Sequence, residues 1–250
     1  MKRLIVGNWK LYINSLAEAE KLLKDIDRVL PRGIKAEIVI CPPVPLAIAL
    51  RQKYGGKRLS FGTQDVSAET EGAHTGGISA RALSESGITY VIVGHVERRA
   101  VGDTNEIIAK KITAALNAGL HPIVCVGERE RDQEGTYLSG LEKDVRESLA
   151  RVSSAFSSRL TIAYDPLWAI GKTEAAPPRV ASESIVFIRK TLAKMWGRDA
   201  ALKIRIIYGG SVDAGNARAF GAEKNIQGLL PGRASVDPKE FASIIKSFSR

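Results

Sequence analysis

Four polar residues of the chain combine the groups that proton transfer beside a carbonyl requires. Lys10, His95, Glu97 and Asp165 each close or follow a short apolar stretch with the pattern of a buried strand. A carboxylate can remove a proton from carbon, an imidazole can move a proton between oxygens, and an ammonium group stabilises negative charge on oxygen. The spacings of the histidines and carboxylates match no metal-binding motif, so we expect no metal. The residues predict acid–base catalysis on a small carbonyl compound.

Two glycine-containing segments near the C-terminal end have the composition of a phosphate site. The Gly-Gly-Ser stretch 209–211 follows one apolar stretch, and Gly232 follows the next, ahead of Ala234 and Ser235. We expect stretch 209–211 to open a short helix, whose N–H groups and positive dipole end would face an anion. The two segments together predict a site for a phosphorylated substrate.

Short apolar stretches alternate with longer helix-like segments along the whole chain. The predicted strands are residues 3–9, 36–41, 58–63, 88–94, 121–126, 160–165, 203–208 and 225–230. No linker divides them, so we expect one domain over residues 1–250. Eight strand–helix pairs in about 250 residues predict an α/β protein with a single (β/α)8 barrel; a doubly wound open sheet is the alternative. In a barrel, the polar residues above would gather at one rim, where the strands end.

Several helix boundaries can be predicted from capping residues. Ser15 with Glu18 forms a capping box ahead of an apolar stripe, and Asp103 with Glu106 repeats the pattern. Gly119 stands where a left-handed residue would end the second of these helices. Asp237 followed by a proline predicts an N-cap and a first helical residue.

The composition is that of an ordinary folded protein with a basic surface. Apolar residues make up 44% of the 250 residues and charged residues 26%, with a net charge of +10. The basic residues are dispersed and form no nucleic-acid motif, so we expect no nucleic-acid partner. No apolar stretch is long enough to span a membrane or to act as a signal sequence, and Cys41 and Cys125 are expected to be buried thiols. These features predict a cytoplasmic protein with no membrane partner.

A segment that begins beside Asp165 has the properties of a lid. Residues 166–173 have an apolar middle between proline and small residues. A loop of this kind can close over a bound substrate and exclude water. We therefore expect a lid that is joined directly to the candidate base.

Seven motifs are distributed over the chain. They are GNWK (7–10), GTQDVSAETEGAHTG (62–76), GHVERR (94–99), CVGE (125–128), AYDPLWAIG (163–171), IIYGGSV (206–212) and LLPGRAS (229–235). The chain resembles the triosephosphate isomerase family in the order and spacing of these motifs, over essentially its whole length. The resemblance implies a TIM barrel and a cofactor-free isomerase of glycolysis and gluconeogenesis. Its implied reaction interconverts dihydroxyacetone phosphate and D-glyceraldehyde 3-phosphate through an enediolate.

The resemblance also implies the role of each catalytic residue. Asn8 and Lys10 would bind the substrate, and Lys10 would stabilise the developing enediolate. His95 would be the neutral group that moves protons between the two substrate oxygens, with Glu97 supporting His95 and Lys10 through hydrogen bonds. Asp165 occupies the position of the base.

Further residues correspond to the family's contacts with phosphate and with a second subunit. Thr75, on the long third loop, resembles the residue that reaches into the partner subunit, which implies a homodimer. The residues that would receive the phosphate are Gly171, Ser211, Gly232 and the backbone of Arg233.

Two departures from the family pattern affect the candidate catalytic site. The family's base is a glutamate where this chain has Asp165, and the family's serine between histidine and glutamate is Val96. Losing one methylene withdraws the carboxylate by about 1 Å, a misplacement that can cost about 100-fold in rate. We expect Val96 to compensate for the shorter base, so the two positions should be coupled.

Other departures lie around the same rim. Leu11 and Tyr12 follow the first lysine, residues 172–173 are Lys-Thr, and Pro231 and Arg233 flank Gly232. Two alternatives to the triose phosphate isomerase therefore stay open. One is a related isomerase of another small sugar phosphate, such as a tetrulose phosphate, and the other is a catalytically impaired barrel that binds a phosphorylated ligand.

Overall fold

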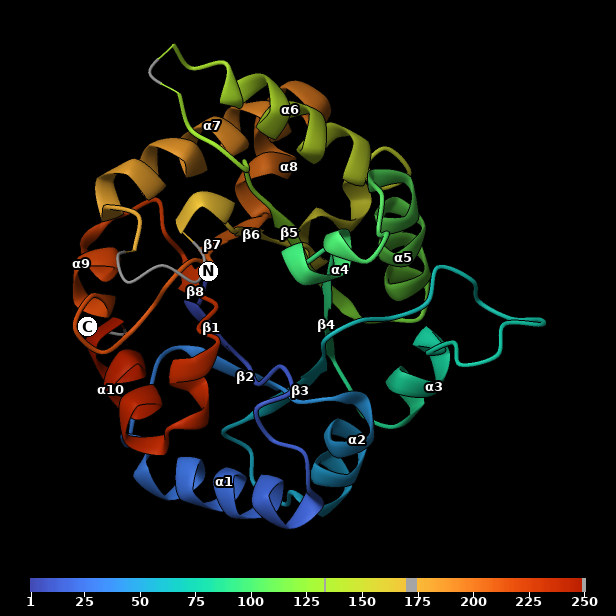
Figure 1. Ribbon diagram of the computed structural model, residues 1–250, viewed down its shortest axis with the longest axis vertical. Coiled ribbons are helices and arrows are strands. Elements are labelled where there is room, and N and C mark those ends of the chain that lie inside the picture. The colour runs from blue at the N-terminus through green and yellow to red at the C-terminus, as the bar shows by residue number, and fades with distance from the viewer. Residues whose placement is uncertain (133, 170–174, 249–250) are drawn as a thin grey trace.

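Eight parallel strands form a closed barrel. The computed structural model describes residues 1–132, 134–169 and 175–248. The strands pair in chain order, and β8 closes the barrel on β1 (Figure 1). They are β1 (Leu4–Asn8), β2 (Glu37–Cys41), β3 (Ser60–Thr63), β4 (Tyr90–Val93), β5 (His121–Val126), β6 (Thr161–Tyr164), β7 (Arg205–Tyr208) and β8 (Gly228–Leu229). The predicted TIM barrel is confirmed, and the open sheet is excluded.

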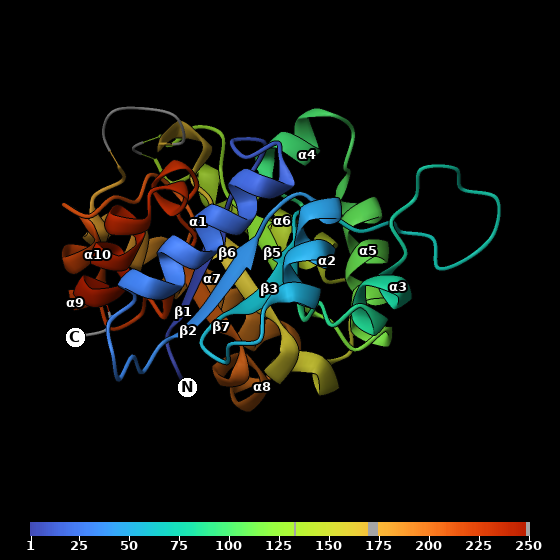
Figure 2. The ribbon, with the colours of Figure 1, turned by 90° about the horizontal axis from the view of Figure 1, so that it is seen from below.

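The helices surround the barrel as an outer ring. Figure 1 shows this ring, and Figure 2 shows α4 at the end of the barrel opposite to α8 and the N-terminus. The α-helices are α1 (Leu16–Val29), α2 (Val44–Lys53), α3 (Ala80–Glu85), α4 (Val96–Ala100), α5 (Asn105–Asn117), α6 (Tyr137–Ser148), α7 (Pro178–Trp196), α8 (Arg198–Lys203), α9 (Ala217–Ala222) and α10 (Pro238–Phe248). Three short 3-10 helices are η1 (Ser154–Arg159), η2 (Leu167–Ala169) and η3 (Arg233–Val236). Among the described residues, no helix is both long and apolar enough to cross a membrane.

The alternation of side chains along the strands divides the apolar core into two parts. Leu4 and Val6 of β1 belong to a cluster inside the barrel, together with Cys41 and Cys125. Ile5, between them in sequence, belongs to the larger cluster between strands and helices. Both faces of the strands are therefore largely buried, which explains why the strands are mostly apolar. The expectation that both cysteines are buried free thiols is confirmed.

The predicted caps are correct at three of the four helix ends. The Ser15 hydroxyl accepts a hydrogen bond from the Glu18 N–H, Gly119 has a φ of 89°, and an Asp237 carboxylate oxygen accepts from two N–H groups at the start of α10. The prediction at Asp103 is wrong, because Thr104 caps α5. The Asp103 carboxylate instead accepts from the Lys111 ammonium group at 2.8 and 3.0 Å.

Lys111 also connects the third loop to helix α5. Lys111 is buried, and its Nζ also lies 2.7 Å from an Asp65 oxygen at the start of that loop. Figure 2 shows the loop between β3 and α3 projecting far beyond the helical ring. Its base is closed by the Ser67 hydroxyl, which accepts from the Ile78 N–H at 2.6 Å.

The Lys111→Met variant is expected to lose about 3 kcal/mol of unfolding free energy, because two poorly exposed carboxylates lose a shared cation. The adjacent Lys110 provides the control. Its exposed ammonium pairs with Glu106 across one helical turn, so Lys110→Met should cost no more than about 0.5 kcal/mol. Urea unfolding of both variants measures the difference. Equal losses would contradict a structural role for the buried lysine.

Candidate active site

The predicted polar residues meet at the carboxyl ends of the strands. A cavity of about 560 Å³ opens there. Its lining contains residues from the first, fourth, seventh and eighth strand ends: Asn8, Lys10, His95, Glu97, Gly209, Gly210, Ser211, Gly232 and Arg233. Asp165 follows β6, is only 2% exposed and is not among the residues that line the cavity. The structure thus brings together the catalytic residues that the sequence predicts.

His95 is held in one tautomer by the start of α4. It caps this helix, and its Nδ1 accepts a hydrogen bond from the Glu97 N–H at 3.3 Å. An accepting Nδ1 carries no proton, so the neutral ring carries its proton on Nε2. Burial lowers the pKa of His95. The carboxylates of Asp165 and Glu97 act to raise it, and the charge of Lys10 acts to lower it further. His95 is therefore a neutral hydrogen-bond donor at physiological pH.

Lys10 and Glu97 form an ion pair across the cavity. The Lys10 ammonium lies 2.7 Å from Glu97 Oε1, and Glu97 Oε2 lies 3.7 Å from His95 Nδ1. Partial burial acts to raise the pKa of Glu97, but the hydrogen bond and charge of Lys10 outweigh it and lower that pKa. Lys10 has a φ of 46°, and its N–H donates to the Asn8 side-chain oxygen at 3.2 Å. These contacts hold a cation at the mouth of the cavity.

Asp165 is a buried carboxylate without the usual donors. Among the described residues, neither of its carboxylate oxygens accepts a hydrogen bond from a nitrogen or oxygen donor. Burial raises the pKa of Asp165, and the thiol of Cys125 and the charge that His95 carries when its ring is protonated partly oppose this effect. A carboxylate with free lone pairs and a raised pKa is suited to act as a general base.

Two glycines make the space that Asp165 occupies. A Cβ at Gly209 would lie 1.7 Å from Asp165 Oδ1, and a Cβ at Gly127 would lie 1.8 Å from the Asp165 carbonyl oxygen. Any side chain at either position would overlap with Asp165. The glycine of the seventh strand end therefore has a steric role that sequence reasoning, which considered only phosphate contacts, did not identify.

Cys125 is another residue whose part in the site was not recognised from the sequence. Its thiol is fully buried, and the desolvation raises its pKa well above the ordinary value, with the Asp165 charge adding to the effect. The raised pKa keeps the thiol protonated, and the thiol acts to lower the pKa of Asp165. Its position at the end of a strand, three residues before Glu128, was the signal available in the sequence.

Replacing Cys125 with alanine is expected to move the acid limb of kcat/KM to higher pH. The thiol lowers the pKa of Asp165, so its removal lets that pKa rise further. The pH profile of kcat/KM in the free enzyme measures this shift. Cys41→Ala, at the other buried thiol in the barrel interior, serves as the control. An unchanged acid limb in Cys125→Ala would show that the thiol does not act on the base.

The predicted phosphate loops need one correction. No helix opens at stretch 209–211, because α9 begins only at Ala217. Asp213 and Asn216 exchange backbone-to-side-chain hydrogen bonds of 3.0 and 2.8 Å, and this turn delays the helix. At the eighth strand end, Gly232 is followed directly by the 3-10 helix η3. The backbone at both segments still faces the cavity.

Only the beginning of the predicted lid lies within the described residues. Residues 170–173, including the predicted phosphate ligand Gly171, lie outside them. The Trp168 indole donates to Glu128 Oε1 at 2.8 Å, and the Ser211 hydroxyl donates to the Ala169 carbonyl oxygen at 3.2 Å. These contacts join the segment after Asp165 to the fifth and seventh strand ends.

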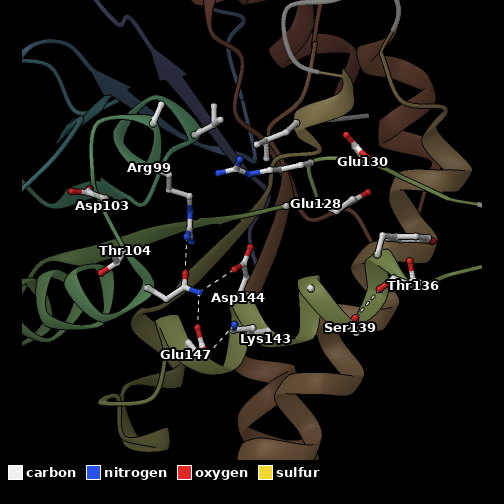
Figure 3. Close-up of a pocket in the computed structure, with 18 of the residues that line it drawn as sticks. Arg99, Asp103, Thr104, Glu128, Glu130, Thr136, Ser139, Lys143, Asp144 and Glu147 are labelled. Carbon is white, nitrogen blue, oxygen red and sulfur yellow. Dashed lines mark hydrogen bonds and ion pairs between the residues drawn. The ribbon is translucent and has the colours of Figure 1, made fainter.

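Thr75 and Val96 lie away from this cavity. Thr75 is exposed on the projecting third loop. Val96 is the first residue of α4 and lines a larger neighbouring cavity of about 1430 Å³, which Figure 3 shows beside α6.

Arg99, which also lines the larger cavity, connects two strand ends of the candidate site. Its guanidinium donates to the carbonyl oxygens of Gly94 at 2.9 Å and Cys125 at 3.2 Å. It donates as well to Asn105, whose amide reaches Asp144 on α6. Arg99 thus fixes the backbone next to His95 relative to the backbone next to the Asp165 pocket.

Comparison with known proteins identifies close relatives. Residues 3–248 match the family model described as triosephosphate isomerase. A triosephosphate isomerase from Carboxydothermus hydrogenoformans is 40% identical over 98% of both chains. One from Moorella thermoacetica is 42% identical over 97% of both chains, and one from Aquifex aeolicus is 39% identical over 99% of this chain and 100% of its own.

Proposed function

The chain belongs to the triosephosphate isomerase family, and on this premise we propose that it interconverts dihydroxyacetone phosphate and D-glyceraldehyde 3-phosphate with Asp165 as the base. Members of the family are aldose–ketose isomerases that act on a small phosphorylated sugar. The observation that carries the proposal is the buried Asp165 carboxylate, free of N–H and O–H donors among the described residues, near a neutral His95.

In the proposed reaction, Asp165 takes the proton from the carbon next to the carbonyl group. The electron pair of the broken C–H bond forms a C=C bond, and the carbonyl oxygen becomes an enediolate oxygen. His95 donates its Nε2 proton to that oxygen and takes up the proton of the neighbouring hydroxyl group. Asp165 then returns its proton to the adjacent carbon, so that the net change is an isomerisation.

The remaining polar residues would bind the substrate and stabilise its charge. Lys10 would stabilise the enediolate oxygen, with Asn8 as a further substrate contact and Glu97 orienting the lysine. The 2.7 Å contact between Lys10 and Glu97 supports this arrangement. The phosphate would be bound by Ser211, Gly232 and the Arg233 N–H, together with Gly171, which lies outside the described residues.

The active protein would be a homodimer in the cytoplasm. Thr75, which is exposed on the projecting third loop, would contact the partner subunit. The two free, buried thiols are compatible with a reducing compartment.

A coupled assay of kcat/KM on triose phosphates and on tetrose phosphates tests the proposal, with Asp165→Ala as the control. We expect turnover of triose phosphates that is lost in the control. Faster turnover of a tetrulose phosphate would instead identify a related isomerase. Binding of a phosphorylated transition-state analogue without turnover of either substrate would identify a barrel that only binds its ligand.

Val96 and Asp165 are expected to be energetically coupled. Val96 occupies the position of the family's serine, and Asp165 that of its glutamate, so both departures concern the same catalytic step. In the Asp165→Glu, Val96→Ser and double variants, we expect an interaction free energy of about 1 kcal/mol in kcat/KM. Effects that add within about 0.3 kcal/mol would contradict the coupling.

A further inference from the structure

A second cation lies at the mouth of the candidate active site. Arg233 follows Gly232 at the start of η3, and its exposed side chain belongs to the lining of the 560 Å³ cavity. Its guanidinium carbon lies 5.7 Å from the centre of the Tyr12 ring, within the range of a cation–π contact. Tyr12, 46% exposed, lines the same cavity.

The barrel fixes this pair by joining the first and eighth strand ends. Strands β1 and β8 are paired, and beyond them the Asn8 N–H donates to the Pro231 carbonyl oxygen at 3.0 Å. The Tyr12 N–H donates to the Trp9 carbonyl oxygen at 3.1 Å, which turns the first loop back towards the cavity. The positions of both side chains therefore follow from the barrel closure.

The charges around the cavity leave Arg233 available for an anion. Glu97 is occupied by Lys10, and an Asp213 carboxylate oxygen accepts the Asn216 N–H at 2.8 Å. Within the described ranges, no carboxylate forms an ion pair with Arg233. In the contact with the Tyr12 ring, no guanidinium N–H group donates a hydrogen bond to an acceptor. These groups therefore stay free for a phosphate, which arginine binds through paired hydrogen bonds.

We propose that Arg233 is a specificity-determining residue whose guanidinium, oriented by Tyr12, binds the phosphate group of the substrate. The inference rests on the proposed function and deepens it, since it adds a side-chain cation to a cradle otherwise made of backbone N–H groups. Lys10, whose Cε would lie 3.5 Å from a Cβ at Gly232, lines the same cavity beside this glycine. A dianionic phosphate beside Gly232 is thus within the field of both cations.

The test compares Arg233→Gln with Arg32→Gln, which removes the same charge from an exposed residue in the segment between α1 and β2. Titration calorimetry with inorganic phosphate should show a dissociation constant about five- to tenfold higher for Arg233→Gln. The KM for triose phosphate should rise by a similar factor, with a smaller change in kcat. Arg233→Lys should recover part of the affinity, and Tyr12→Leu should lose part of it.

Unphosphorylated D-glyceraldehyde separates a phosphate contact from a structural effect. We expect the loss of kcat/KM in Arg233→Gln to be about five- to tenfold greater for the phosphorylated substrate than for D-glyceraldehyde. Equal losses on both substrates, or an unchanged phosphate affinity, would overturn the inference about Arg233. Turnover of triose phosphate by the wild type would still support the proposed isomerase function. If the wild type turns over no triose phosphate, the proposed function fails, and the phosphate titrations still decide the role of Arg233.

Discussion

Replacing Asp165 with alanine is expected to lower kcat on triose phosphate by about 10³-fold, within the range of about 10²–10⁴ that a general base contributes. The remaining rate would come from binding and from Lys10 and His95, which stabilise the charge on oxygen. Asp165→Asn keeps the size of the side chain and removes the base. It should therefore lose activity to a similar extent.

The pH dependence distinguishes the loss of a base from a loss of structure. In the wild type, kcat/KM should fall as the pH drops through the raised pKa of Asp165, because only the ionised carboxylate accepts a proton. This limb should be absent from the residual activity of Asp165→Asn. A variant that retains the same acid limb would contradict the assignment of the base.

Stability at neutral pH provides a further control on Asp165. Its folded pKa is raised, so the folded state binds more protons than the unfolded state between the two pKa values. The contribution of Asp165 to the free energy of unfolding therefore falls as the pH rises from the unfolded to the folded pKa. At pH 7 the ionised carboxylate destabilises the fold. Asp165→Asn should then melt no lower than the wild type at neutral pH. A large fall in Tm would attribute the lost activity to unfolding.

The Gly209→Ala variant is expected to lose about 100-fold or more in kcat while keeping the barrel. The new methyl group would lie 1.7 Å from Asp165 Oδ1, so the carboxylate must move. The carboxylate is at the end of a side chain and can rotate, so the cost falls on the geometry of the base rather than on the backbone. A displacement of about 1 Å at a reacting group costs about 100-fold.

Gly55→Ala is the matched control for this steric effect, because a Cβ at Gly55 has no atom within 4 Å. Its kcat and circular dichroism spectrum should equal those of the wild type. For Gly209→Ala, the spectrum should stay native while kcat falls. Wild-type activity in Gly209→Ala would show that the buried position of Asp165 is not the catalytic one.

The order of the elements could be predicted from the sequence because each strand is buried on both faces. All eight apolar stretches contain a strand; β5 has the predicted bounds, and the other seven strands are shorter than their stretches. The error at Asp103 has a physical cause, since an aspartate ahead of a helix can either cap it or pair with a cation about two turns further on. Lys111 lies eight residues downstream and decides the outcome only in the folded chain.

The candidate site was predictable where a residue acts through its own functional group, as His95 and Lys10 do. The space around Asp165 could not be predicted in this way, because it depends on which atoms of neighbouring strand ends approach one another. Cys125 lies in β5 and Gly209 follows β7, and the pairing of both strands with β6 brings these residues to the same carboxylate. The helix expected at stretch 209–211 was wrong for a local reason, the turn between Asp213 and Asn216.

The left-handed backbone conformation at Lys10 lowers the stability of the fold, although the side chain of Lys10 serves catalysis. For a residue with a Cβ this conformation costs about 1–2 kcal/mol of folding free energy, whereas glycine adopts it without that cost. Selection for heat resistance alone would therefore favour glycine at position 10, and selection for turnover retains the lysine. A more robust descendant of this chain must gain its stability elsewhere, in the outer helices or at the closed end of the barrel, and leave this strained turn as it is.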